Sequence, residues 1–223
     1  HKCRNLYHAL SRYVKSQDKI KWFSYIQKSN TLRRLDYPYD ESQSLGLFDQ
    51  AIKQFKENKF SPIKSLSTRP IFIIGMPRSG TTLAESILGA HSECVACGES
   101  LALREVLQPK GKYIDNSSGA SAFSFVENMD LYDEEMLTNC ANRYLTRMRQ
   151  HSVTANHTID KMPHNFIYLP FILAMFPDAK VIWMDRNPIS VVMSIYEQNF
   201  VKLLTNWQKG KAKTWMRMLL VST

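Results

Sequence analysis

The stretch from Pro70 to Leu83 constrains the fold of this chain more than any other, because it joins an apolar strand to a glycine-bounded turn and a helix start. Ile71 to Ile74 is apolar without alternation, which is typical of a strand buried on both faces of a parallel sheet. Gly75 and Gly80 bound the turn, and the helix after it would present unpaired N–H groups to an anion. The sequence therefore predicts a phosphate-binding or sulfate-binding turn.

The turn differs from a nucleotide-binding P-loop in its cation. A P-loop carries a Lys that reaches the β and γ phosphates, next to a hydroxyl that holds Mg²⁺. Here Arg78 lies inside the loop, and Thr81 and Thr82 occupy the hydroxyl positions with no Lys before them. This pattern favours a phosphate or sulfate ester over a metal-bound triphosphate. Taken alone, the stretch also fits an ordinary strand-to-helix turn with an N-cap.

Length, charge and cysteine content limit the class of protein. The 223 residues suit one α/β domain with an appendage, and no apolar run approaches the ~20 residues that span a bilayer. The net charge of +9 fits an anionic ligand, but the basic residues are spread along the chain without a nucleic-acid-binding motif. Four scattered cysteines predict a reducing, cytoplasmic setting. Cys94 and Cys97, with His91, lack a fourth ligand, so no metal site is predicted.

The N-terminal part has a helical pattern. Apolar and aromatic residues recur at helical spacing over residues 5–36, and the polar break Ser16-Gln17-Asp18 divides them into an antiparallel hairpin. Residues 41–60 repeat the amphipathic pattern, and residues 61–70 read as a linker into the first strand. We therefore predict a helical region ahead of the α/β domain.

Strand and helix patterns alternate after the linker, which predicts a parallel sheet with its ligand at the carboxyl ends of the strands. Arg78 and Arg186 both fall just past a predicted strand. Pro188 is placed to open a helix. The elements predicted beyond the first loop and its helix are helices over 133–150 and 166–175 and a buried strand over 180–184. Two anion sites at one edge of a sheet are therefore expected.

These motifs resemble those of a known family. Pro77-Arg78-Ser79-Gly80-Thr81-Thr82-Leu83 resembles the 5′-phosphosulfate loop of sulfotransferases, and Arg186-Asn187-Pro188 with Ser194 resembles their 3′-phosphate site. Residues 160–166 and 30–34 are most similar to bacterial sulfotransferases that carry tetratricopeptide repeats, and tyrosylprotein sulfotransferases are related. The resemblance implies a three-layer, P-loop-like α/β fold with a central parallel sheet, preceded by a tetratricopeptide-like helical hairpin.

The resemblance also implies the chemistry. Such enzymes move a sulfuryl group from 3′-phosphoadenosine 5′-phosphosulfate (PAPS) to an acceptor hydroxyl and release adenosine 3′,5′-bisphosphate, without a metal. The acceptor is a protein tyrosine, a carbohydrate or a small molecule. Lys161 would stabilise charge at the bridging oxygen. The residues that would hold the donor are Arg78, Ser79, Gly80, Thr81 and Thr82 at the 5′ end, and Arg186 and Ser194 at the 3′ end.

The acceptor hydroxyl needs a general base, for which the sequence offers two candidates. Glu99 lies in Gly98-Glu99-Ser100, whereas tyrosylprotein sulfotransferases have Gly-Glu-Glu with the second Glu catalytic. Glu99 is thus either the base or the first, structural Glu, and His164 is the reserve. Gln198 stands where those relatives add a second Arg to the 3′-phosphate site.

The resemblance divides the chain and leaves two rivals. Residues 1–60 would be helical, 68–200 the sulfotransferase domain, and 201–223 an atypical tail that is truncated or frame-shifted. The beginning of the chain also reads as a cut inside a repeat. A P-loop nucleotide kinase or NTPase would need a loop Lys and Mg²⁺. A tetratricopeptide interaction module with an inactive sulfotransferase domain would bind a protein partner without nucleotide affinity.

Overall fold

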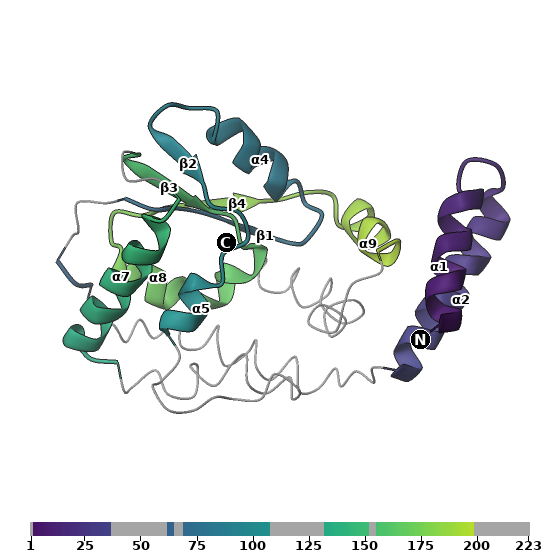
Figure 1. Cartoon of the computed structure of the whole chain (residues 1–223), viewed down its shortest axis with the longest axis horizontal. Coiled ribbons are helices and arrows are strands. Elements are labelled where there is room, and N and C mark those ends of the chain that lie inside the picture. The colour runs from purple at the N-terminus through teal and green to yellow at the C-terminus, as the bar shows by residue number, and fades with distance from the viewer. Residues whose placement is uncertain (1, 37–61, 65–68, 108–131, 152–154, 199–223) are drawn as a thin grey trace. The chain divides into compact units, whose positions relative to one another are not determined.

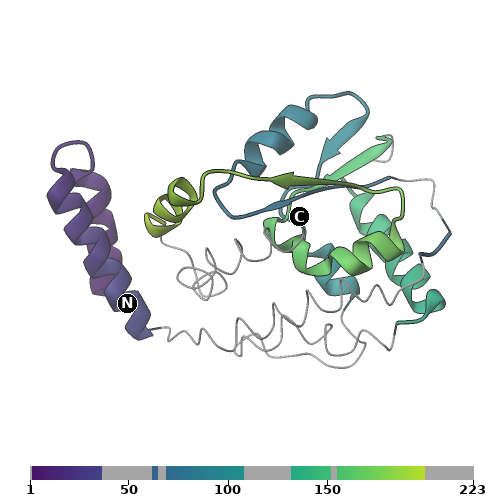
Figure 2. The ribbon, with the colours of Figure 1, turned by 180° about the vertical axis from the view of Figure 1, so that it is seen from behind.

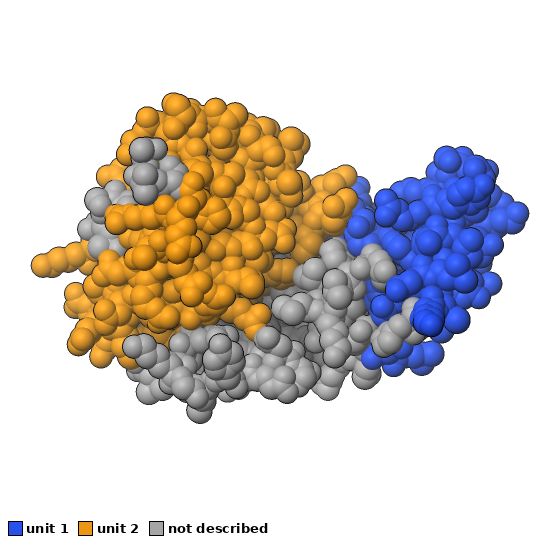
Figure 3. All heavy atoms as spheres, viewed as in Figure 1, with its two compact units in different colours: residues 1–48, 187–223 blue, residues 49–186 orange. Residues whose placement is uncertain are grey.

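The computed structural model describes residues 2–36, 62–64, 69–107, 132–151 and 155–198 (Figure 1). The chain forms two compact units, one of residues 1–48 with 187–223 and one of residues 49–186 (Figure 3). The helix predicted over 41–60 and the tail over 201–223 lie outside the described residues. The division into domains made from the sequence stays a prediction.

The first unit contains the helical hairpin that the sequence predicted. Helix α1 (Lys2–Val14) and helix α2 (Lys19–Asp36) pack side by side (Figure 1). The polar break separates them because Asp18 caps α2: its Oδ1 accepts hydrogen bonds from the N–H groups of Ile20 and Lys21 at 3.0 and 2.9 Å. Exposed hydroxyl and amide groups around the break leave no apolar face to bury there.

Helix α9 (Pro188–Tyr196) belongs to the same unit as the hairpin. Pro188 opens this helix as predicted, and the Asn187 side chain caps it by accepting from the Ser190 N–H. Asn30 donates from α2 to the Tyr196 carbonyl at 3.0 Å. A polar side chain of α2 therefore satisfies a carbonyl at the end of α9.

The second unit is built on a parallel sheet of four strands in the order β2-β3-β1-β4 (Figure 1). Its strands are β1 (Ile71–Gly75), β2 (Cys94–Ala96), β3 (His157–Asp160) and β4 (Lys180–Met184). Phe72 of β1 pairs with Asp160 on one side and Val181 on the other. Phe72, Ile73 and Ile74 are at most 1% exposed, as the unbroken apolar run predicted.

Helices cover both faces of this sheet. Helix α4 (Thr81–Leu88) lies on one face, and α5 (Ala102–Val106), α7 (Glu134–Met148), the 3₁₀ helix η3 (Pro163–Tyr168) and α8 (Leu169–Met175) lie on the other (Figures 1 and 2). Aromatic side chains fill the second interface, where Phe72 packs against Tyr144 and Phe176. The predicted three-layer α/β fold with a central parallel sheet is confirmed.

The connections create a switch point between two neighbouring strands. The chain leaves β1 through α4 on one face, and it leaves β3 through η3 and α8 on the opposite face (Figures 1 and 2). The carboxyl ends of β1 and β3 therefore flank a switch in the direction of the connections, where open α/β sheets bind ligands.

The sequence reading missed two strands and one short helix. It assigned no element to β2, α5 or β3. Strand β3 carries polar side chains that are nonetheless buried, since Thr158 is 2% exposed and Asp160 is 0% exposed. Such a strand shows neither an apolar run nor alternation, so periodicity could not reveal it.

Candidate functional site

The turn after β1 leaves the start of α4 open to an anion. Ser79 N–H donates to the Met76 carbonyl at 3.1 Å, which closes the turn. Gly80 is the N-cap of α4 and has no side chain to satisfy the first N–H groups of the helix. The Ser79 Oγ is buried and makes no hydrogen bond to any described residue. An anion with several acceptor oxygens fits these unsatisfied donors.

Gly75 and Arg78 have demanding backbone conformations within this turn. Gly75 has a φ of 151°, and a Cβ there would lie 2.8 Å from the Met184 carbonyl oxygen of β4. Only glycine therefore lets the turn lie this close to the neighbouring strand. Arg78 has a φ of 72°, which is left-handed and unfavourable for a side chain of its kind. Strain of this sort persists where the surrounding structure enforces it, and it is typical of ligand-binding loops.

The structure brings the two predicted arginines together. Arg186 follows β4, which pairs with β1 as far as Gly75 and Met184. Its Nη1 donates to the Arg78 carbonyl at 3.0 Å, so the loops after β1 and β4 are tied to each other. Both arginine residues are exposed. Ser194 lies on α9 in the first unit, and its pairing with Arg186 in a 3′-phosphate site stays a prediction.

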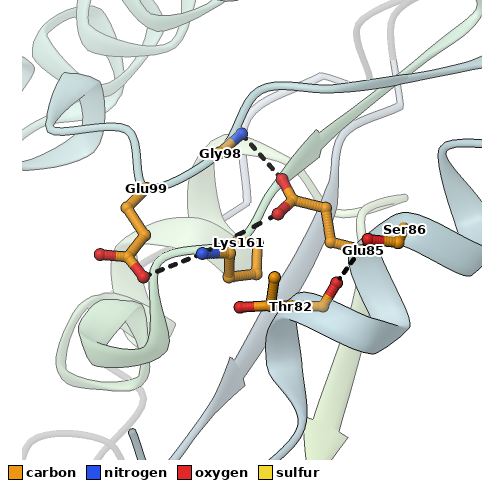
Figure 4. Close-up of polar contacts among 6 residues, drawn as sticks. All are labelled: Thr82, Glu85, Ser86, Gly98, Glu99 and Lys161. Carbon is orange, nitrogen blue, oxygen red and sulfur yellow. Dashed lines mark hydrogen bonds and ion pairs between the residues drawn. The ribbon is translucent and has the colours of Figure 1, made fainter. Parts of the chain in front are cut away.

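Lys161 lies at the end of β3 and bonds to two glutamates (Figure 4). Its Nζ donates to Glu99 Oε1 at 2.8 Å and lies 3.8 Å from Glu85 Oε2. The Lys161 residue is 6% exposed, which makes it a buried cation rather than a solvated surface lysine. Its two partners differ, because the Glu85 side chain is 11% exposed and the Glu99 side chain 59%.

Backbone hydrogen bonds carry the β2–β3 pairing beyond the strands and into this cluster. Cys97 N–H donates to the Ile159 carbonyl at 2.9 Å, and Lys161 N–H donates to the Gly98 carbonyl at 3.0 Å. Glu85 Oε1 on α4 accepts the Gly98 N–H at 2.8 Å (Figure 4). The turn that carries Glu99 is therefore held from the strand and from the helix together.

A second group of buried polar side chains lies beneath Lys161. Burial raises the pKa of Asp160 to about 7, although a hydrogen bond from the Tyr144 hydroxyl at 2.9 Å lowers it. Burial likewise raises the pKa of the Cys97 thiol to about 11, with a further contribution from the Asp160 carboxyl. The pKa of Tyr144 is raised well above its usual value by burial. Cys97 and Tyr144 therefore keep their protons at neutral pH, whereas Asp160 titrates in this range.

The site contains two acidic residues that the sequence reading did not select, Glu85 and Asp160. Glu85 stands one helical turn after Thr81 on α4, and Asp160 directly precedes Lys161. Neither residue carried a local signal, because in α4 the buried positions are Thr81 and Glu85 while the apolar Leu83 and Ile87 are exposed. Of the two candidate bases, Glu99 contacts Lys161, and His164 lies three residues further on in η3.

The described part of the chain offers no arrangement for a metal ion, since no three His, Cys, Asp or Glu side chains converge there. All four cysteines are free thiols, and Cys97 is buried. Among the described residues no helix is long and apolar enough to cross a membrane.

The fold and the turn define an α/β protein with a candidate anion site at the carboxyl ends of β1, β3 and β4. The chain belongs to the sulfotransferase family, because the profile of that family matches residues 70–220. The matched range runs past Phe200, where the sequence reading placed the end of the resemblance.

Similar proteins come from bacteria and animals. The chain is 36% identical over 192 residues to an uncharacterized protein of Aquifex aeolicus, covering 83% of this chain and 25% of that protein. It is 31% identical over 162 residues to protein-tyrosine sulfotransferase 1 of Danio rerio, covering 63% and 41%. It is 28% identical over 203 residues to protein-tyrosine sulfotransferase 1 of Mus musculus, covering 83% and 50%. The chain thus spans between a quarter and a half of these relatives.

Proposed function

We propose that this protein transfers a sulfuryl group from PAPS to an acceptor hydroxyl and releases adenosine 3′,5′-bisphosphate, without a metal. The observation that carries the proposal is the position of Lys161. It is a buried cation held by two carboxylates, at the end of the strand beside the anion-binding turn. A cation placed there can stabilise the charge that develops on the oxygen of a departing phosphate.

PAPS supplies the activated sulfuryl group, and the residues of the turn fit its 5′ end. The unsatisfied Ser79 Oγ and the uncapped start of α4 would donate to the phosphosulfate, together with Gly80, Thr81 and Thr82. Arg78 would add its charge at the same end. Arg186 and Ser194 would bind the 3′-phosphate, the arginine through its planar pair of donors.

The proposed reaction needs a proton acceptor for the hydroxyl that attacks. Glu99 is suited to it, because its side chain is more than half exposed and still reaches Lys161. The acceptor oxygen forms a bond to sulfur as its proton passes to the Glu99 carboxylate. The bond from sulfur to the bridging oxygen breaks, and adenosine 3′,5′-bisphosphate leaves with that electron pair, stabilised by the Lys161 ammonium.

Protein tyrosine is the first acceptor to test, since two of the relatives reported above are named protein-tyrosine sulfotransferases. Carbohydrate and small-molecule hydroxyls are the alternatives. The hairpin of α1 and α2 would be a tetratricopeptide-like element that contacts a protein partner, and the location would be cytoplasmic. The arginines and the lysine of the proposed site would all contact PAPS, so they do not select among these acceptors.

Calorimetry with adenosine 3′,5′-bisphosphate tests the donor site. We expect binding that does not depend on Mg²⁺ and that is lost in Arg186→Ala, while Arg143→Ala on the exposed face of α7 binds normally. Binding of ATP only in the presence of Mg²⁺ would instead indicate a nucleotide kinase or NTPase. Absence of any nucleotide binding would indicate an interaction module with an inactive domain.

A further inference from the structure

Glu85 is the least expected member of the site. It is a glutamate at 8% exposure on α4, the helix that begins at the anion-binding turn. A carboxylate is costly to bury unless its oxygens are paired. Both oxygens of Glu85 are engaged, one with the Gly98 N–H at 2.8 Å and the other with the Lys161 ammonium at 3.8 Å. The carboxylate therefore joins three separate segments.

We infer that Glu85 is a positioning residue that holds Lys161 and the Gly98–Glu99 turn in register with the anion-binding turn after β1. The expected effect on kcat rests on the proposed function, whereas the role of Glu85 in holding Lys161 and the Gly98–Glu99 turn rests on the contacts alone. Figure 4 shows Glu85 projecting from α4 between Gly98 and Lys161, with Glu99 on the far side of the lysine.

Glu85 and Glu99, the two carboxylates that contact Lys161, have different roles under this inference. Glu99 must give up its interaction with Lys161 when it accepts the proton of the acceptor hydroxyl and loses its charge. A buried ammonium left without a counter-charge at that moment would be strongly disfavoured. Glu85 does not meet the acceptor in this scheme, because it is buried and bonded to the backbone of Gly98. It keeps a negative charge beside Lys161 throughout the transfer.

Glu85→Gln separates the two functions of the carboxylate. The amide oxygen can still accept the Gly98 N–H, whereas the charge beside Lys161 is lost. We expect kcat for release of adenosine 3′,5′-bisphosphate from PAPS to fall about 10- to 100-fold, with KM for PAPS within about threefold of the original value. Glu135→Gln makes the same change at an exposed position on α7 and should leave both constants unchanged. An unchanged kcat in Glu85→Gln would overturn the inference.

Amide hydrogen exchange of Gly98, followed by NMR, tests the same residue without any turnover. Glu85→Ala removes the acceptor of this N–H, and we expect its exchange to accelerate at least about tenfold. Glu85→Gln should restore the protection, and Ser86→Ala on the exposed side of the same helix should not alter it.

The two measurements distinguish failure of this inference from failure of the proposed function. Retained protection of Gly98 in Glu85→Ala would overturn the positioning role whether or not the protein turns over PAPS. Lost protection in a protein that releases no adenosine 3′,5′-bisphosphate would support the positioning role and contradict the proposed reaction.

Discussion

The ends of β1 and β3 lie side by side in the sheet but are built by opposite means. At the end of β1 the backbone makes the site. Its N–H groups are presented by a turn with two glycines, an arginine in the left-handed backbone conformation and a helix start without a side-chain cap. At the end of β3 the side chains make it, through the buried Lys161 and the acidic residues around it. The first construction depends on shape and the second on balanced charge.

This difference indicates which substitutions should disrupt the backbone-built half at the end of β1 and which should disrupt the charge-built half at the end of β3. A site made from backbone N–H groups depends above all on the conformation of the chain. A site made from buried ions tolerates small changes of shape but not the loss of one partner, because the others are then left uncompensated. Four substitutions separate these two kinds of dependence.

The largest effect is expected from Lys161→Met, which breaks the charge-built half. The methionine has a similar length and no charge, so Glu85 and Glu99 lose their shared partner. Under the proposed reaction, kcat with PAPS should fall about 100- to 1,000-fold, because a preorganised donor to the leaving oxygen is removed. Lys180→Met, at an exposed position in β4, is the matched control for steady-state kinetics and should retain full activity. Equal losses in both variants would contradict a special role for Lys161.

Gly75→Ala should break the backbone-built half. The added Cβ would lie 2.8 Å from the Met184 carbonyl oxygen, on a residue whose φ is 151°. We expect the free energy of unfolding, measured in urea, to drop by about 2 to 3 kcal/mol. Gly98→Ala is the comparison, since a Cβ there meets nothing within 4 Å and only its φ of 70° is unfavourable. A loss in Gly75→Ala no larger than in Gly98→Ala would remove the steric explanation.

Asp160→Asn tests the charge-built half through the dependence of stability on pH. The Asp160 pKa is raised from 3.8 to about 7 in the fold, so the folded protein holds this proton where the unfolded chain has lost it. The stability that the group contributes is therefore present at low pH and is lost as the pH rises through about 7. Between pH 5 and 8 the substituted protein should gain about 2 to 3 kcal/mol relative to the original. Urea unfolding at both pH values measures this, and a constant difference would contradict it.

The smallest effect should come from Arg78→Gly, which relaxes the strained turn. Glycine adopts a φ of 72° without the clash that arginine incurs there. Stability should rise by up to about 1 kcal/mol, while the proposed binding of adenosine 3′,5′-bisphosphate weakens. Arg78→Ala loses the same charge and keeps the strain, so it should weaken binding without the gain. Equal thermal stability of the two variants would show that the left-handed turn costs little.

Much of the fold could be predicted from the sequence because the signals were local. Short patterns indicated the local conformation by themselves: the apolar run of β1, the glycines of its turn and the proline that opens α9. The hairpin of α1 and α2 followed from helical spacing and one polar break. Strand β3 could not be found this way, since its polar residues are buried only through partners distant in the sequence.

The residues of the candidate site were easier to predict from the sequence than the contacts between them. Arg78 and Arg186 followed from their positions just past predicted strands, and Lys161 and Glu99 from the family resemblance; the structure places Lys161 against Glu99. Glu85 could not be chosen from its own surroundings in the sequence, because its role depends on the Gly98 backbone, which joins it only in the fold. The same holds for Asp160, whose hydroxyl partner Tyr144 comes from α7.

The continued hydrogen bonding between Cys97 and Ile159, and between Gly98 and Lys161, has a consequence for how the protein can diversify. The residue proposed to take the acceptor's proton stands on an extension of the sheet and shares the rigidity of the core. Under the proposed reaction, a change of acceptor preference would therefore come from residues other than Glu99, whose position the sheet fixes.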